Sequence, residues 1–276
     1  LKADSFYFCD SKLHLGIKSC RFVEKSGLQV DSLRGTFSMD STRMDVSSLQ
    51  LATPESRLAV DFGMDLNAFA DKAPGKLKAI VHGEVGKQDI LKIAGPNLPR
   101  ELARRWPSYP LGIDVVARGN MQKMHLSGVR LLLPTAFRIT GDGFAANLTD
   151  PNHLKADVAL HAKTYNLNFL TPMLGPTLGK TVRVPSGIAF DGKIRVDGSN
   201  YLTHFVASQG GGELRGNAQV DIKKMAYNVR LNAQRLPLQN FLPKMGLHPF
   251  TGYITAQGEG ADILSPKMRL KAEAGI

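Results

Sequence analysis

The sequence lacks the features that mark a membrane-spanning helix or an exported precursor. No run of about 18 apolar residues occurs, so no segment is predicted to cross a membrane as a helix. The chain begins at Leu1, with neither an initiating Met nor a signal peptide. We therefore expect an internal segment of a longer protein, whose anchor or export signal would lie elsewhere in the parent chain.

Cysteine is scarce, with Cys9 and Cys20 the two in the chain. An oxidising compartment would permit a disulfide between them, and two free, buried thiols are equally compatible with the sequence. Their spacing does not match a metal site. The cysteines therefore leave both the redox compartment and the pairing open.

Motifs of nucleotide-binding and catalytic sites are missing. The stretch 175–181 is similar to a phosphate-binding loop, but it has three residues between its glycines where that loop needs four. The residues that follow it are extended and cannot supply the helix N-terminus that holds phosphate. Gly258-Glu259-Gly260 lacks the third glycine of a dinucleotide fingerprint, and no Gly-x-Ser-x-Gly elbow occurs.

The seven histidines do not show zinc-site spacing, because none forms an i, i+4 pair with a neighbouring Glu. His153 and His161 fall on the same side of a predicted strand, but eight residues of strand would hold them about 26 Å apart. Acidic residues are spread along the chain, so paired carboxylates stay compatible with the sequence. We predict no catalytic residue, no metal site and no cofactor.

What the sequence does have is an excess of positive charge, with 35 Lys and Arg against 24 Asp and Glu and a net charge of +11 over 276 residues. Such a balance favours acidic partners, either nucleic acid or anionic lipid headgroups. The densest basic clusters, Arg100–Arg105 and Lys223–Lys224, are too short to predict nucleic-acid binding. A solvated, Lys-rich outer surface is the alternative explanation of the charge.

Alternation of apolar and polar residues is the dominant pattern from end to end. Every second position of 58–66, 154–162, 188–196 and 225–233 is apolar or glycine, with polar residues such as Asp61 and Lys155 between them. A period of two indicates strands with one apolar and one solvated face, which is typical of antiparallel sheets. Helical pattern is scarce, and the clearest prediction is one short helical insertion near 97–107.

A small unit recurs along the chain: a polar residue, a glycine, and then alternating residues that enter a strand. Its clear members have glycine at positions 35, 83, 119, 192, 216 and 258, with a weaker member at 143. Glycine at the same place in successive strands would let a sheet curve in one direction, although the hairpin glycines of a β-sandwich would give the same motif. Because the periodicity runs along 1–276, we predict a single all-β segment, an elongated and curved antiparallel sheet forming a groove or β-taco, with a few short helices.

The motifs of two regions carry a resemblance to a known family. Residues 26–35, followed by Leu49–Leu51 and Thr53–Ser56, resemble the TamB branch of the AsmA-like superfamily. The tail is similar at Tyr227–Ala233, 241–243, 251–253 and 258–262. The resemblance implies a large periplasmic protein, anchored in the inner membrane by an N-terminal helix and associated at its other end with an outer-membrane barrel of the Omp85 type. It also implies a taco-shaped sheet with an apolar interior, linked to phospholipid movement between membranes and to outer-membrane protein assembly. The family supplies no catalytic residues.

We predict that one parity of each strand lines a hydrophobic groove for phospholipid acyl chains. The candidate lining residues are Val60, Phe62, Met64, Val158, Leu160, Phe190, Ile194, Tyr227, Val229 and Leu231. The inward parity of any β fold has the same pattern, so a dry, filled core is the competing interpretation of these residues. The alternative functions are a binding or adhesion module that recognises protein or glycan without lipid, a chaperone surface whose edges pair with substrate strands, and, third, an enzyme.

Overall fold

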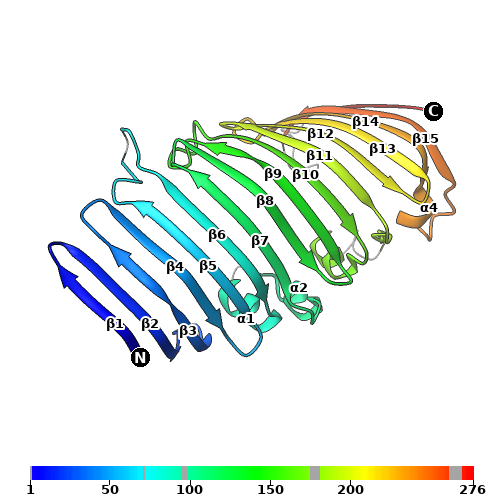
Figure 1. Ribbon diagram of the computed structural model, residues 1–276. Helices are drawn as coiled ribbons and strands as arrows, with labels where there is room; N and C mark the ends of the chain where they lie inside the picture. The colour runs from blue at the N-terminus through cyan, green and yellow to red at the C-terminus, as the bar shows by residue number, and fades with distance from the viewer. Residues whose placement is uncertain (1, 71, 95–97, 175–180, 261–268) are drawn as a thin grey trace. The chain divides into compact units, whose positions relative to one another are not determined.

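The computed structural model describes residues 2–70, 72–94, 98–174, 181–260 and 269–276 (Figure 1). Within this range the chain divides into two compact units, Leu1–Pro134 and Thr135–Ile276. The glycine-rich stretch at 175–180, considered above as a phosphate loop, lies outside the described residues.

The first unit is an antiparallel sheet of eight strands that are hydrogen-bonded in sequence order. Its strands are β1 (Lys2–Cys9), β2 (Lys12–Val23), β3 (Gln29–Met39), β4 (Arg43–Ala52), β5 (Arg57–Asp65), β6 (Leu77–Val85), β7 (Leu111–Gly119) and β8 (Lys123–Leu133). Two short helices, α1 (Lys87–Ala94) and α2 (Arg100–Arg105), form an insertion between β6 and β7.

The second unit repeats this plan with eight further antiparallel strands in sequence order. Its strands are β9 (Phe137–Ala146), β10 (Lys155–Thr164), β11 (Ala189–Asp197), β12 (Asn200–Gln209), β13 (Gly212–Asp221), β14 (Ala226–Pro237), β15 (Pro249–Glu259) and β16 (Arg269–Gly275). A 3-10 helix, η2 (Asn168–Leu174), follows β10, and a single helical turn, α4 (Leu238–Phe241), follows β14.

The all-β, antiparallel fold class predicted from the alternation is confirmed, because every strand within a unit pairs antiparallel with its sequence neighbour. The helix α2 lies inside the range 97–107, where a short helix was predicted. The helix α1 was not predicted, because eight residues are too few to display a helical period. In the described part of the chain, no helix is long and apolar enough to span a membrane.

Polar side chains at the hairpin turns help to set the strand pairing. At three hairpin turns, the side-chain oxygen of Asp40, Asn120 or Asp221 accepts hydrogen bonds from the backbone N–H groups two and three residues later, at 2.7–3.1 Å. Such local bonds favour a tight turn in the isolated sequence. They therefore fix which residue of one strand faces which residue of the next.

Three glycines of the recurring unit sit where two strands approach closely. Gly35, Gly83 and Gly119 have φ angles of +151°, +147° and +152°, which residues with a side chain rarely adopt. A Cβ at Gly83 or Gly119 would lie 2.1 Å from a carbonyl oxygen of the adjacent strand. These glycines serve close approach within the sheet, which is one of the roles that glycine inside a strand predicts.

The helix α1 is tied to the β4–β5 turn by a buried carboxylate. Asp89, in the first turn of α1, is 3% exposed, and its Oδ2 accepts hydrogen bonds from the hydroxyls of Thr53 and Ser56. The Ser56 Oγ in turn accepts a bond from the N–H of Gly86 at 2.9 Å, just before the helix begins. This network holds the α1–α2 insertion at one end of the strands.

Replacing the buried carboxylate should therefore cost stability. We expect Asp89→Ala to lower the free energy of unfolding by about 2–3 kcal/mol, because it leaves two buried hydroxyls without their acceptor. Urea unfolding followed by circular dichroism measures this. The exposed acid Glu101→Ala in α2 is the control, with an expected loss below about 1 kcal/mol. Equal losses in the two variants would contradict the assigned role of Asp89.

Candidate functional site

Cross-strand register brings the apolar residues of the first unit into continuous rows. One row crosses every strand from β1 to β8 and consists of Phe6, Leu15, Phe37, Val46, Phe62, Ala79, Ala117 and Leu126. The neighbouring row consists of Phe8, Leu13, Met39, Met44, Met64, Leu77, Gly119 and Met124. Directly opposed residues point to the same face of a sheet, so one face of this unit is apolar across its full width.

The second unit has equivalent rows from β9 to β16. One consists of Gly143, Val158, Ile194, Thr203, Ala218, Val229, Ala256 and Ala272. The next consists of Gly141, Leu160, Gly192, Phe205, Gly216, Leu231, Ile254 and Ala274. Small residues and glycine are frequent in these rows, and a single hydroxyl, that of Thr203, interrupts the first.

Seven of the ten predicted lining residues lie in these four rows, and the other three, Val60, Phe190 and Tyr227, lie on the same faces beside them. Those of β5 share one face of the first unit, and those of β10, β11 and β14 share one face of the second, where Val158 is directly opposite Ile194. All ten side chains are half-buried; none is enclosed and none is fully exposed. Sequence reasoning missed other members, notably Phe37 and Phe205, whose rows become visible only when each residue is matched to its cross-strand partner.

Fully enclosed apolar side chains in the described residues are few, and most lie at strand ends, in turns or in the short helices. They are Val30, Ala68, Leu102, Met124, Leu133, Ala136, Phe169, Val196 and Ala233. A β-sandwich would instead bury the middle of its strands beneath a second sheet. The middle of the apolar rows in each unit is therefore only half-buried, which a dry, filled core does not explain.

Aromatic rings of the second unit lie over glycines of its apolar face. Phe190 and Phe205 stack with ring centroids 5.6 Å apart and an angle of 22° between the rings. A Cβ at Gly216 would lie 2.2 Å from the ring of Phe205, and one at Gly192 would lie 2.7 Å from the ring of Phe190. Gly192 and Gly216 belong to the recurring unit, so in β11 and β13 its glycine makes room for an aromatic ring.

A methyl group at this position should be poorly tolerated. We expect Gly216→Ala to lower the free energy of unfolding by about 1–3 kcal/mol, since the Phe205 ring must leave its position. Combining it with Phe205→Leu should recover part of the loss in a double-mutant cycle measured by urea unfolding. Gly112→Ala is the control, because its Cβ would make an ordinary 3.5 Å contact. Strictly additive effects of the pair would contradict the ring-over-glycine packing.

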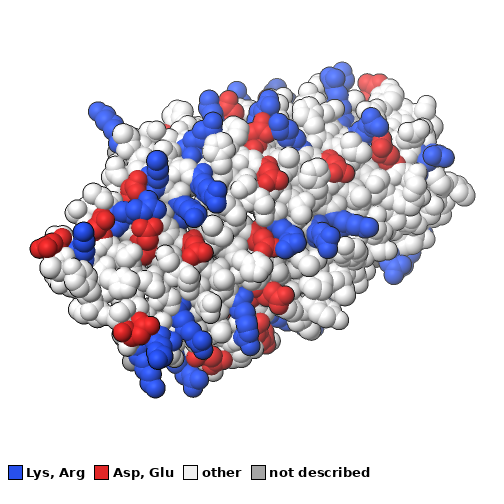
Figure 2. All heavy atoms as spheres, viewed as in Figure 1, with Lys and Arg blue, Asp and Glu red and all other residues white. Residues whose placement is uncertain are grey.

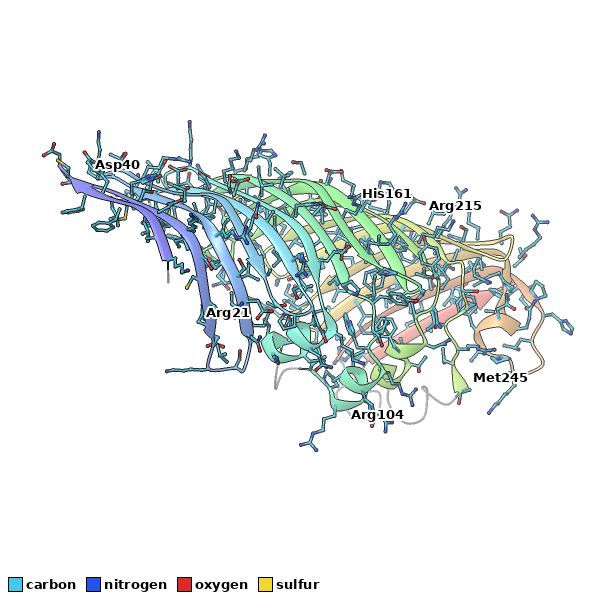
Figure 3. All side chains as sticks on the ribbon, turned by 60° about the horizontal axis from the view of Figure 1, so that its bottom comes forward. Arg21, Asp40, Arg104, His161, Arg215 and Met245 are labelled. Carbon is cyan, nitrogen blue, oxygen red and sulfur yellow. The ribbon has the colours of Figure 1, made fainter. Side chains whose placement is uncertain are left out.

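The opposite face of each sheet carries charged side chains that pair across strands. Asp157 on β10 accepts hydrogen bonds from two residues of β11, Lys193 at 3.0 Å and Arg195 at 3.3 Å. In the first unit Asp114 pairs with His82 and with Arg130. Figure 2 shows acidic and basic side chains interspersed, and Figure 3 shows His161 and Arg215 projecting from the convex side of their bent strands. The polar face is therefore convex in the second unit, and its apolar face is concave.

The ion pairs of the polar face make the free energy of unfolding depend on pH, in a direction that follows from the pKa shift of Asp157. The hydrogen bond from Lys193, with a smaller one from Arg195, lowers the pKa of the Asp157 carboxyl, although partial burial opposes the shift. A lowered folded-state pKa contributes stability that is present above the unfolded pKa of about 3.9 and is lost as the pH falls through the folded value.

Removing Lys193 should accordingly raise the pKa of Asp157 toward its ordinary value. We expect Lys193→Ala to do so in an NMR titration of the carboxyl, and to shrink the loss of stability on acidification below about pH 4. The exposed Lys163→Ala on β10 serves as the control and should leave the Asp157 titration unchanged. An unchanged titration in Lys193→Ala would rule out this pairing.

A hollow of about 830 Å³ lies in the polar face of the first unit. Its lining carries both signs of charge equally, with Arg34, Arg57 and Arg130 against Glu55, Glu84 and Asp114. This balance favours neither an anion nor a cation. Among the described residues, no cluster of His, Cys, Asp and Glu has a metal-binding arrangement.

The two cysteines are free thiols that lie at opposite ends of the β1–β2 pair. Cys9 is opposite Lys12 beside the turn, whereas Cys20 is opposite Leu33 near the far end of β2. The eight residues from Lys12 to Cys20 span about 26 Å of strand, which is beyond the reach of a disulfide. The thiols are free, but the buried state that the sequence left open is wrong, because Cys9 is exposed and Cys20 is half-buried.

No family model, curated protein or solved structure matches the chain. The resemblance to TamB-type proteins consequently stays a prediction.

Proposed function

We propose that the chain is a segment of a lipid-carrying envelope protein whose apolar sheet face holds the acyl chains of phospholipids. One observation carries the proposal: apolar rows cross every strand of each unit, yet the ten predicted lining residues stay half-buried. A sheet that folds for stability alone normally covers such a face with a second layer. A face left half-covered can accept an apolar ligand.

The dimensions of the face suit an acyl chain. Eight strands are separated by seven spacings of about 4.8 Å, so each apolar face is roughly 34 Å across its strands. The acyl region of one bilayer leaflet is about 15 Å deep, half of the hydrocarbon thickness of a membrane. Each unit could therefore hold acyl chains at several positions along its rows.

The energetics favour a continuous face over a single pocket. Exposing a lipid to water costs about 0.8 kcal/mol per CH₂, which is more than roughly 20 kcal/mol for two acyl chains. The one polar side chain in the four rows is Thr203. The rows therefore remove most of this cost at nearly every strand, so a lipid can move from one strand to the next. The glycines and small residues of the second unit's rows lower the steric barriers to such sliding.

In keeping with the resemblance, we propose a periplasmic parent protein that is anchored in the inner membrane. Its groove would carry phospholipid between the inner and outer membranes and support outer-membrane biogenesis. An Omp85-type outer-membrane barrel would be contacted through other parts of the parent chain. We assign no enzymatic role and no cofactor to this segment.

The direct test is native mass spectrometry with lipid extraction of the purified chain. We expect phospholipid to co-purify, and we expect Phe62→Glu or Val229→Glu to reduce the bound lipid several-fold, because an ionised carboxylate in the apolar row must stay hydrated. Circular dichroism and urea unfolding confirm that each variant is folded.

The controls change charge on the polar face. Asp61 is the polar-face neighbour of Phe62, and Asp61→Lys is one control. This substitution also removes the 2.7 Å hydrogen bond that Asp61 accepts from the N–H of Ser48. Arg230→Glu, the exposed neighbour of Val229, is therefore the cleaner control and should retain lipid. Equal lipid loss in the apolar-face and polar-face variants would count against the groove. So would a wild-type protein that neither carries lipid nor takes up an acyl-chain probe.

A further inference from the structure

The α1–α2 insertion of the first unit carries an exposed cluster of cations. Lys92, Arg100, Arg104 and Arg105 are all exposed, and Glu101 is the single exposed acid in the described residues 87–94 and 98–110. The second acid of the insertion, Asp89, is buried and turned toward the β4–β5 turn. Five cations, with the half-buried Lys87 included, against two acids leave a net charge of +3 (5 − 2) on this insertion.

Two of these cations are not neutralised by neighbouring acids. Glu101 is bridged by Arg104 at 2.8 Å and lies 4.0 Å from Arg105. Lys92 and Arg100 have no ion pair with any acid in the described part of the chain. An anion that approached this surface would therefore find unpaired positive charge.

Exposed apolar side chains lie beside the cations. Ile93 is 68% exposed and Tyr109 is 53% exposed, whereas Leu102 is buried at 5% and Leu133, at the end of β8, is completely enclosed. The insertion thus buries one apolar side chain, Leu102, and leaves two others facing water. Exposed apolar groups beside cations form the mixed surface that interfacial membrane segments present.

The two helices form one surface. Lys87 at the start of α1 donates a 2.7 Å hydrogen bond to the carbonyl of Trp106, just after α2. Figure 3 shows α1 and α2 side by side at the end of β6 and β7, with Arg104 directed away from the strands. The Asp89 network fixes this surface to the sheet.

Charge distinguishes this surface from the corresponding helices of the second unit. The segments Asn168–Leu174 and Leu238–Phe241 contain no charged residue. The cationic surface is therefore a specific feature of the α1–α2 insertion and does not follow from the plan that the two units share. Single-stranded nucleic acid is the less suitable partner, because proteins bind it with aromatic side chains that stack on the bases along a basic groove.

We propose that the α1–α2 insertion docks on the surface of an anionic phospholipid bilayer. Lys92, Arg100, Arg104 and Arg105 face the phosphates, and Ile93 and Tyr109 enter the headgroup region. This docking rests on the proposed function in one respect: the docked bilayer would be the source or destination of the acyl chains.

The test is co-sedimentation of the whole chain with phosphatidylglycerol vesicles and with phosphatidylcholine vesicles. Binding to phosphatidylglycerol alone, weakened by added salt, is expected. The double variant Lys92→Ser/Arg100→Ser should partition about 25-fold more weakly, since each cation near the surface contributes roughly a factor of five. Ile93→Ser should weaken binding several-fold.

The matched control is Arg138→Ser/Lys163→Ser, which removes two exposed and directly opposed cations from the polar face of β9 and β10. It changes the net charge equally and should keep full binding. Equal loss in the two double variants would overturn the docking surface in favour of non-specific attraction. Wild-type protein that does not sediment with phosphatidylglycerol vesicles but is retained on heparin would overturn bilayer docking in favour of another polyanion.

Bound lipid measured in the same preparations separates this proposal from the groove. A Lys92→Ser/Arg100→Ser protein that retains co-purified phospholipid but no longer sediments with vesicles would support docking as a separate step. Lipid-free protein that still sediments with phosphatidylglycerol would overturn the groove and leave the docking surface standing. Lipid-loaded wild-type protein that does not sediment would overturn the docking surface alone.

Discussion

Cross-strand pairing in register is the interaction on which the other features of this chain depend. The side chains of a strand alternate between two faces, so a slip of one residue would move the apolar set of that strand to the polar face. Side-chain bonds at the turns, such as those of Asp40, Asn120 and Asp221, act locally to hold the register. Once it is held, rows of apolar residues and glycine, interrupted in the second unit by Thr203, align across each unit. Ion pairs such as Asp157–Lys193 collect on the other face.

A sheet with one apolar face must cover it, bind something on it, or tolerate its exposure to water. In each unit, fully buried apolar side chains lie mainly at strand ends, in turns and in short helices, as at Leu133 and Leu102. In the second unit, aromatic rings over Gly192 and Gly216 keep the apolar surface continuous where a side chain is missing. The remaining face is half-buried, and this is the physical basis of the proposed acyl-chain groove. The cationic α1–α2 insertion adds an element suited to lipid headgroups at one end of the first unit's strands.

Much of the fold could be predicted from period-two alternation, because each strand carries its own pattern independently of its neighbours. Phe62 and Val229 were assigned to the apolar parity from their strands alone, and both lie in the apolar rows. Phe205 was missed because its strand includes Thr203 and its importance depends on Gly192 and Gly216 in the adjacent strands. The Asp89 network was likewise beyond sequence reasoning, since it joins residues more than thirty positions apart. The recurring glycines were recognised, but their two distinct roles, close backbone approach and space for an aromatic ring, follow only from the packing.

The most direct measurement of the central claim is photo-crosslinking with a phospholipid that carries a diazirine in its acyl chain, followed by mass spectrometry to locate the adducts. We expect adducts on the apolar rows, at residues such as Phe62, Leu160 and Leu231, and none on their polar-face neighbours. Labelling that is absent, or that is spread equally over both faces, would contradict an acyl-chain groove.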